Sequence, residues 1–283
     1  MSDELKGKIV VITGGSGGIG KEAALGLGRL GAHLVLVVRD AARGQATADE
    51  IKAATGAEVE LAIADLSSLA SIRKVAAELM ARFPKIHVLL NNAGASNATR
   101  KVTVDGLEAT FATNHLAYFL LTNLLVDTLK ASAPSRIVNV ASQAHVGASV
   151  PFDDLQAEKS YSVFGRYGQS KLMNILFTYE LARRLEGSGV TVNCLHPGVV
   201  ATGFGQNDPG IFRFAVKLVK PFFISPAKGA LTSIYLASSP EVEGVSGKYF
   251  AKCKEKKSSQ QSHDVEVAKR LWQESERIVA AVA

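Results

Sequence analysis

The chain has 283 residues, of which 47% are hydrophobic, and it carries a formal net charge of +6 at neutral pH. This length and apolar content are enough to fill the core of one large domain. The basic excess is spread along the chain with few aromatic residues between the charges, so it favours an anionic small ligand or surface and argues against nucleic acid. No run reaches the roughly 18 apolar residues of a membrane span, and Met1–Val10 carries no secretory signal. With only Cys194 and Cys253 present, no disulfide framework is indicated, and we expect a soluble, cytoplasmic protein.

The first predicted element is the strand Ile9–Ile12, which is uniformly apolar, as in a strand buried on both faces of a parallel sheet. Five glycines follow within seven residues, and a helix is predicted over Lys21–Leu30. A glycine turn between a strand and a helix lets the backbone approach a pyrophosphate, to which the helix presents free amide groups. The turn fits two dinucleotide-binding patterns, G-x-G-x-x-G from Gly15 and T-G-x-x-x-G-x-G from Thr13.

Strands and helices then alternate to the end of the chain. Further strands are predicted over His33–Val38, Glu58–Ala64, Val88–Leu90, Ser135–Ala141, Gly189–Leu195 and Gly247–Phe250. Further helices are predicted over Ala41–Thr55, Ser68–Phe83, Gly106–Lys130, Arg166–Glu186, Pro226–Ser238 and Val265–Ala280. This order predicts an α/β fold with a doubly wound parallel sheet and helices on both faces. We expect a single domain over residues 1–283, with a dinucleotide-binding core at about 7–200, a substrate lid at about 203–225 and a C-terminal helix at about 264–281.

Ligands of such sheets bind beyond the carboxyl ends of the strands, which lie along one edge. The residues that end these strands are Thr13, Arg39, Asp65, Asn92, Ser142 and Pro197. We expect them to converge, although they come from distant parts of the chain.

The end of the second strand indicates which dinucleotide binds. An acidic residue there suits the ribose 2′-hydroxyl of NAD, and an arginine suits the 2′-phosphate of NADP. Arg39 directly follows the last apolar residue, Val38, and Arg43 lies one helical turn further on, so NADP(H) is preferred over NAD(H). The usual spacing of about 20 residues from the glycines would instead select Asp40 as an acidic residue for the ribose of NAD. Asp65 can accept a hydrogen bond from the adenine amino group, or it can cap the helix that begins near residue 68.

A pair of residues with acid–base potential lies on the predicted helix 166–186. Tyr167 and Lys171 are four residues apart and therefore share one face. A phenol titrates near 10, and a nearby ammonium lowers its pKa toward the range that a general acid or base needs. Lys171 can also donate to the ribose hydroxyls of a nicotinamide cofactor. The alternative interpretation is an ordinary helix surface.

Two more polar residues complete this candidate site. Ser142 ends the fifth strand and can polarise a substrate oxygen, or it can be a simple turn residue. Asn114 lies inside a helical pattern where asparagine is unfavourable, which predicts a local kink with an exposed carbonyl for a water relay. A tolerated surface asparagine is the alternative.

Taken together, these motifs resemble the short-chain dehydrogenases/reductases over almost the whole chain. The motifs are Thr13-Gly14-(x3)-Gly18-Ile19-Gly20, Asp65-Leu66, Asn91-Asn92-Ala93-Gly94, Asn114, Ser142, Tyr167-x-x-x-Lys171 and Pro197-Gly198-x-Val200-x-Thr202. The resemblance implies a Rossmann-type domain with the catalytic tetrad Asn114, Ser142, Tyr167 and Lys171. It implies that Tyr167 exchanges a proton with the substrate oxygen, Ser142 orients that oxygen, Lys171 lowers the phenol pKa and Asn114 holds a water that links Lys171 to solvent.

The resemblance also implies a set of cofactor-binding residues. They are Gly14, Ser16, Gly18, Ile19, Gly20, Arg39, Asp65, Leu66, Asn92, Ala93, Gly94, Tyr167, Lys171, Pro197, Gly198, Val200 and Thr202.

Finer features are similar to the retinol dehydrogenase branch of this family. They include Arg39-Asp40, Asn114-His115-Leu116 before an apolar helix, the wide gap between Ser142 and Tyr167, and Gly247-Lys248-Tyr249-Phe250. This resemblance implies NADP(H) and an apolar alcohol, aldehyde or ketone as substrate. Two features depart from the branch. No N-terminal membrane anchor is seen, and Gly17 occupies a position where some NADP enzymes place a basic residue, so the cofactor preference depends mainly on Arg39.

The segment 210–224 combines four phenylalanines with Arg213, Lys217 and Lys220, which would form one basic stripe on a short apolar helix. One interpretation is a lid packed on the body of the domain. The other is that the lid also makes peripheral contact with an anionic membrane. Its phenylalanines favour an apolar small-molecule substrate.

Three further features have simpler interpretations. His145, His196 and His263 lack ligand spacing, so we assign no metal site and expect ordinary polar or core roles for them. The basic run 252–257 is expected to be a solvated loop. The apolar helix faces at 116–125 and 172–179 fit either a homodimer of paired helices or burial against the sheet.

The sequence therefore predicts an NADP(H)-dependent oxidoreductase that transfers hydride between nicotinamide and an apolar alcohol, aldehyde or ketone. One alternative keeps this chemistry but takes a secondary-metabolite or xenobiotic ketone. The other is a non-catalytic NADP-binding regulator, which would have no need for the set of Ser142, Tyr167 and Lys171.

Overall fold

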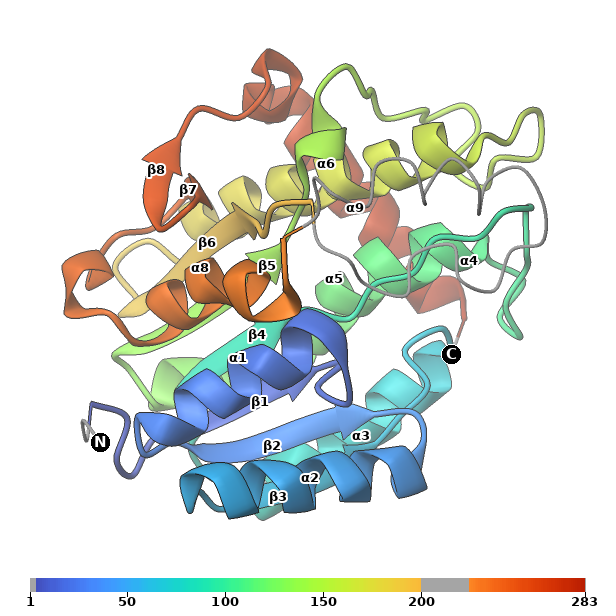
Figure 1. Ribbon diagram of the computed structural model, residues 1–283. Coiled ribbons are helices and arrows are strands. Elements are labelled where there is room, and N and C mark those ends of the chain that lie inside the picture. Colours follow the sequence, from blue (N-terminus) through green and yellow to red (C-terminus); the bar gives the residue numbers. More distant parts are fainter. Residues whose placement is uncertain (1–3, 200–223, 283) are drawn as a thin grey trace.

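The structure is a computed structural model that describes residues 4–199 and 224–282. Its centre is one eight-stranded sheet with the strand order β3-β2-β1-β4-β5-β6-β7-β8 (Figure 1). The strands are β1 (Ile9–Thr13), β2 (His33–Val38), β3 (Val59–Ile63), β4 (Val88–Asn91), β5 (Ser135–Val140), β6 (Val190–His196), β7 (Lys248–Ala251) and β8 (Lys254–Lys256). Neighbouring strands from β3 through to β7 pair in parallel, which confirms the predicted doubly wound fold. The order of strands reverses between β1 and β4, where doubly wound sheets bind their ligands.

The last strand, β8, corrects the prediction of a loop at 252–257. It pairs antiparallel with β7 through a tight turn in which Lys252 and Cys253 have φ of 53° and 56°. Two-residue hairpin turns of this kind usually contain Asn-Gly or Asp-Gly, so the pair Lys-Cys does not predict one. All three residues of β8 are exposed, so the strand also lacks an apolar pattern.

The helices begin and end close to where the sequence predicts them. They are α1 (Gly18–Arg29), α2 (Ala41–Thr55), α3 (Leu69–Arg82), α4 (Ala109–Phe111), α5 (Ala117–Ala131), α6 (Val163–Arg184), α8 (Pro226–Ser238) and α9 (Val265–Ala281). The predicted helix 106–130 is interrupted between α4 and α5 by a π-helical turn, η1 (Ala112–Leu116), which contains Asn114. This turn confirms the predicted kink.

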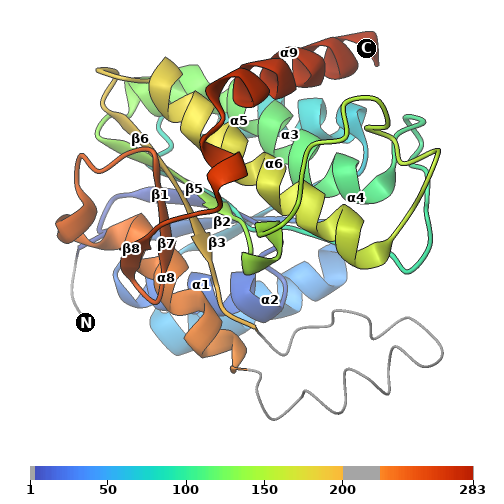
Figure 2. The same cartoon turned by 90° about the horizontal axis from the view of Figure 1, so that it is seen from above.

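Helices cover both faces of the sheet, as the views from the side and from above show (Figures 1 and 2). Side chains alternate along β1, so Val10 and Ile12 face α1, α2 and α8, while Val11 faces α3, α5 and α6. Both faces are packed with fully buried aliphatic residues. This two-sided burial explains why the strands read as continuous apolar runs.

The C-terminal helix α9 lies across α5 and α6 on the outer side of one layer (Figure 2). Its Trp272 packs edge-on against Phe119 of α5 at 4.9 Å between ring centroids and nearly parallel to Phe177 of α6 at 5.8 Å. Arg184 covers the outer face of the indole at 4.0 Å. The apolar faces of α5 and α6, which the sequence assigned to a homodimer or to burial, are therefore buried within the chain.

No helix within residues 4–199 and 224–282 combines the length and the apolar content needed to cross a bilayer.

Replacing Trp272 with alanine should lower the free energy of unfolding by about 3 kcal/mol, because it removes a large buried aromatic side chain and leaves a cavity between α5, α6 and α9. Urea denaturation followed by circular dichroism measures this change. Lys269→Ala on the exposed side of α9 is the matched control and should change the free energy by less than about 0.5 kcal/mol. Equal stability of both variants would contradict the packing role of α9.

Candidate active site

The glycine turn between β1 and α1 has the backbone geometry of a phosphate-binding loop. Gly14 and Gly18 adopt φ of 69° and 52°, which other residues rarely tolerate. A Cβ at Gly20 would lie 2.3 Å from the carbonyl oxygen of Gly14, so only glycine lets the turn close against the helix. Helices α2, α3, α6, α8 and α9 all have a side chain that caps their first turn, whereas Gly17, the residue before α1, has no side chain to cap that helix. The amide groups of α1 can therefore receive a phosphate.

Residues at the ends of β1 and β4 lock the neighbouring loop to this turn. The Thr13 hydroxyl accepts hydrogen bonds from the backbone amides of Asn92 and Ala93, at 2.9 and 3.0 Å. The side-chain Nδ2 of Asn92 donates to the Thr13 carbonyl at 2.9 Å. The loop with Asn92, Ala93 and Gly94 thus lies beside the glycine turn at the point where the strand order reverses.

A basic group reaches the glycine turn from α2. The Arg43 Nε donates to the Ser16 carbonyl at 3.1 Å, and a Cβ at Gly17 would lie only 2.4 Å from Arg43 Nη2. Arg43 thus occupies the space that a side chain at position 17 would take. Sequence reasoning placed Arg43 near Arg39 but not on the turn itself. Arg43, Ser16, Gly17, Lys21 and Thr47 line a cavity of about 370 Å³.

The neighbouring acidic residues have structural partners. Asp40 caps α2 by accepting from the Arg43 amide at 2.9 Å, so its carboxylate is directed into the helix. Arg39 is exposed at the end of β2. Asp65 accepts from the backbone amide and the hydroxyl of Ser67, at 2.9 and 2.8 Å. The cap of α3 is Ser68, so the alternative role of Asp65 as that cap is wrong.

Tyr167 and Lys171 lie on one face of α6, next to the end of β5. The Ser142 side chain hydrogen-bonds the Tyr167 phenol. The Lys171 ammonium lies 5.5 Å from the Tyr167 ring centroid and donates to the Val140 carbonyl at 2.9 Å. A Cβ at Gly94 would lie 3.5 Å from Lys171 Nζ, so the lysine also borders the loop from β4.

Burial controls the protonation of both groups. It lowers the pKa of Lys171 to about 8, because a buried ammonium loses its hydration. Burial also raises the pKa of Tyr167, and the hydrogen bond from Ser142 only partly opposes this. The expectation that the lysine leaves the phenol with a lowered pKa is therefore wrong for the protein alone. The site starts with a neutral phenol and an ammonium that can lose its proton just above neutral pH.

Asn114 is wholly buried in the π-helical turn. Its Oδ1 accepts from the Ala95 amide at 2.7 Å, and its Nδ2 donates to the Ala95 carbonyl and to Ser170 Oγ, both at 2.9 Å. The predicted exposed carbonyl is wrong, because the whole residue has no solvent-accessible surface. Its Oδ1 and Lys171 Nζ nevertheless both border Gly94, at 3.4 and 3.5 Å from a Cβ built there.

Two histidines hold the turn that carries Ser142. His145 Nδ1 donates to the Ser142 carbonyl at 2.6 Å, and its Nε2 accepts from the Ser259 amide at 3.0 Å. His196 Nδ1 accepts from the Gln143 amide at 3.1 Å. Burial lowers the pKa of His145 and lowers that of His196 to about 4, so both stay neutral at physiological pH. The third histidine, His263, stacks on Tyr179 of α6 with 5.2 Å between ring centroids.

The end of β6 completes the edge of the sheet. Gly198 has φ of 94°, and a Cβ there would lie 2.5 Å from Ile224 Cδ1. The Ile224 amide donates to the Val199 carbonyl at 2.9 Å, so residues 199 and 224 lie side by side. Val200, Thr202, most of the predicted lid 203–225 and the basic stripe of 210–224 lie outside the described residues.

A larger cavity of about 990 Å³ lies at the amino ends of the strands. Lys8, Arg136, Glu186 and Glu243 line it with both signs of charge. None of the predicted site residues borders it, and the acid–base groups lie at the other end of the sheet. We therefore place the candidate active site at the carboxyl edge.

The comparisons with known proteins agree with this geometry. The family model for short chain dehydrogenases matches residues 8–209. Retinol dehydrogenase 14 from Homo sapiens is 47% identical and is aligned over 97% of this chain and 87% of its own length. A crystal structure of an uncharacterized protein from Mycobacterium Paratuberculosis is 32% identical, with a TM-score of 0.80 over 97% of this chain and 94% of that one. RhlG from Pseudomonas aeruginosa, in a complex with NADP in its active site, is 28% identical, with a TM-score of 0.72 over 88% and 96% of the two chains. The chain therefore belongs to the short-chain dehydrogenase family, as its motifs indicate, and it resembles the retinol dehydrogenases over nearly its whole length.

Proposed function

We propose that this retinol dehydrogenase-like oxidoreductase uses NADP(H) to interconvert an apolar alcohol with its aldehyde or ketone. The observation that carries the proposal is the cluster of Ser142, Tyr167 and Lys171 at the carboxyl edge of the sheet, beside a glycine turn built for a dinucleotide phosphate. A non-catalytic NADP-binding regulator would have no use for a hydrogen-bonded phenol with a buried ammonium beside it.

When bound, a nicotinamide cofactor would supply or accept the hydride. Ser142 donates a hydrogen bond to the substrate oxygen and holds it against the phenol. Tyr167 gives its proton to that oxygen during reduction, or takes it during oxidation. The Lys171 ammonium stabilises the phenolate that remains, and its lowered pKa lets it pass a proton on near neutral pH.

The preference for NADP(H) is supported by two arginines from β2 and α2. Arg39 at the end of β2 is exposed and free to turn toward a 2′-phosphate, and Arg43 lies on the glycine turn. A guanidinium can form a charge-assisted pair with phosphate, whereas a ribose 2′-hydroxyl requires an acceptor. The one carboxylate at the predicted spacing, Asp40, is engaged in capping α2.

An apolar substrate is supported by exposed hydrophobic side chains that are close in sequence to Ser142, to Tyr167 and to the end of β6. Phe164 precedes Tyr167 by one helical turn and is 67% exposed, and Val146 and Val199 are each 57% exposed. Retinol dehydrogenases act, by their name, on an apolar alcohol. The same surface also suits a secondary-metabolite or xenobiotic ketone.

We also propose that the protein is soluble and cytoplasmic, that the segment 210–224 makes peripheral membrane contact, and that the protein forms a homodimer. Because α9 covers the apolar faces of α5 and α6, a homodimer would have to use another surface.

Tyr167→Phe should reduce kcat for NADPH-dependent reduction of all-trans-retinal by at least about 100-fold, because it removes the proton donor. The Kd for NADPH, measured by fluorescence titration, should stay within about twofold. Tyr235→Phe, which removes a surface hydroxyl bonded to Glu241, is the matched control and should keep full activity. Undiminished turnover by Tyr167→Phe would disprove the assigned chemistry.

Arg43→Ala and Arg39→Ala should each raise KM for NADPH by about 10- to 100-fold, the loss expected for one hydrogen bond to a charged group. Neither substitution should change KM for NADH, because NADH lacks the 2′-phosphate. Arg29→Ala, at the far end of α1, controls for the loss of one positive charge. A panel of aldehydes and ketones assayed with both cofactors measures these values and also ranks the substrates. Equal rises for NADPH and NADH would refute the assigned preference.

A further inference from the structure

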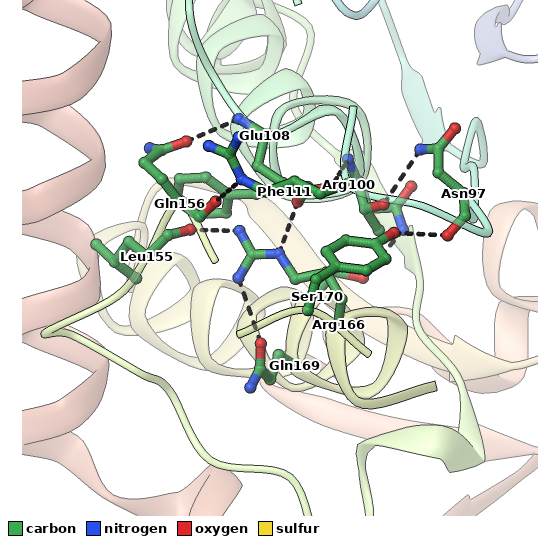
Figure 3. A network of polar contacts seen from close by, with 12 residues as sticks. Asn97, Arg100, Glu108, Phe111, Leu155, Gln156, Arg166, Gln169 and Ser170 are labelled. Atoms are coloured by element: carbon green, nitrogen blue, oxygen red, sulfur yellow. Dashed lines mark hydrogen bonds and ion pairs between the residues drawn. The ribbon is translucent and has the colours of Figure 1, made fainter. Parts of the chain in front are cut away.

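A buried ion pair joins the helix that carries Tyr167 to the helix that precedes Asn114. Arg166 and Glu108 are 58 residues apart, and Arg166 Nε lies 2.6 Å from Glu108 Oε2. Their side chains are 1% and 0% exposed. Figure 3 shows the pair at the centre of a network of polar contacts.

Arg166 uses its whole guanidinium to hold surrounding segments. Besides Glu108, it donates through Nη1 to Gln169 Oε1 at 3.3 Å and through Nη2 to the Leu155 carbonyl. Its planar group also lies over the Phe111 ring, 5.2 Å from the centroid. These contacts fix the first turn of α6 at the residue directly before Tyr167.

Glu108 in turn fixes the start of α4. Its Oε1 accepts from the Thr110 amide and its Oε2 from the Phe111 amide, both at 2.8 Å. Its own amide donates to Gln156 Oε1 at 2.7 Å. Helix α4 continues without a break into the π-helical turn, so the position of Glu108 sets the position of Asn114 six residues later.

A second connection joins the same two segments on the side of the active site. Asn114 Nδ2 donates to Ser170 Oγ at 2.9 Å, and Ser170 Oγ donates to the Tyr167 carbonyl at 2.8 Å. The segment 108–114 and α6 are thus tied at two points, one at the ion pair and one at Asn114 and Ser170. Two tie points fix both the distance and the rotation between the two segments.

We propose that Glu108 and Arg166 are a positioning pair for the proton relay, which holds Asn114 in register with Lys171 and Tyr167. Neither residue touches substrate or cofactor; both act through the placement of Asn114. The proposal rests on the proposed function, because it assumes that Asn114 and Lys171 take part in turnover.

The energetics favour a geometric role for the pair over a purely stabilising one. Removing two charges from water carries a large desolvation cost, and apolar residues of similar volume often give equal or greater stability. The guanidinium fork, however, bonds in fixed directions that apolar contacts cannot reproduce. A displacement of about 1 Å at a catalytic group can cost 100-fold in rate.

The test compares Arg166→Met with the neutral pair Glu108→Gln/Arg166→Met. Both should lower kcat for retinal reduction by roughly 10- to 100-fold while KM for NADPH stays within about twofold. The neutral pair should recover most of the melting temperature that Arg166→Met loses, but it should not recover kcat. Recovery of kcat together with stability would overturn the proposal.

A double-mutant cycle with Asn114→Ala tests whether the pair acts through that residue. Arg166→Met should cause no further loss of kcat in the Asn114→Ala background. Losses that multiply would show an independent effect and overturn the proposal. Glu180→Gln is the matched control, because Glu180 is a buried carboxylate paired with Arg183 and Arg184 at the other end of α6. It should lower stability and leave kcat unchanged.

Amide hydrogen exchange separates failure of this proposal from failure of the proposed function. If the wild-type protein turns over no alcohol, aldehyde or ketone, the proposed function fails, yet exchange still reports on the pair. In the neutral pair, exchange should accelerate in both 110–114 and 167–171, and Glu180→Gln should leave both segments unchanged. Unchanged exchange in the neutral pair would overturn the positioning role by itself.

Discussion

The side-chain amide of Asn114 joins the two halves of the candidate site. On one side it bonds the amide and the carbonyl of Ala95, which fixes the loop that follows Asn92 and Gly94 beside the glycine turn. On the other side it bonds Ser170 on α6, one position before Lys171. The nucleotide-binding half and the acid–base half of the edge therefore share one buried residue, and moving it would move both. Within the π-helical turn both the oxygen and the nitrogen of this amide have partners, as a buried amide requires.

Burial makes this arrangement suitable for proton transfer. Both Tyr167 and Lys171 are pushed toward their neutral forms, because each would carry its charge in a poorly hydrated place. For the lysine this brings the pKa to about 8, close to working pH, where a proton can leave and return readily. The phenol keeps its proton in the protein alone, because burial opposes the charge of a phenolate. The direction of the shift at Tyr167 therefore suits a group that starts the reaction as a proton donor.

Much of the fold could be predicted because local and global signals agree in this chain. The strands are buried on both faces, so their apolar runs are unambiguous, and the helix starts carry capping residues such as Asp40 and Ser68. Ser142 could be placed at the carboxyl edge because parallel strands align their carboxyl ends, and the family resemblance joined Tyr167 and Lys171 to it. What could not be predicted depends on contacts between distant residues. The hairpin at Lys252 has no turn signature, Arg43 reaches the glycine turn only in three dimensions, and the sign of the pKa shift at Tyr167 depends on burial, which a sequence does not report.

The C-terminal helix supports the same π-helical turn from outside. His115 follows Asn114 directly, and its Nε2 hydrogen-bonds Ser275 of α9 at 2.9 Å. Burial lowers the pKa of His115 to about 3, so the ring stays neutral and stacks on Phe111 at 5.6 Å without a charge to hydrate. Glu108 and Arg166 hold one end of the turn, and α9 holds the other through His115. Because Trp272 anchors α9 on α5 and α6, Ser275 of α9, 160 residues from His115 in sequence, contributes to the placement of Asn114. The packing of α9 on α5 and α6 therefore also supports the π-helical turn that holds Asn114.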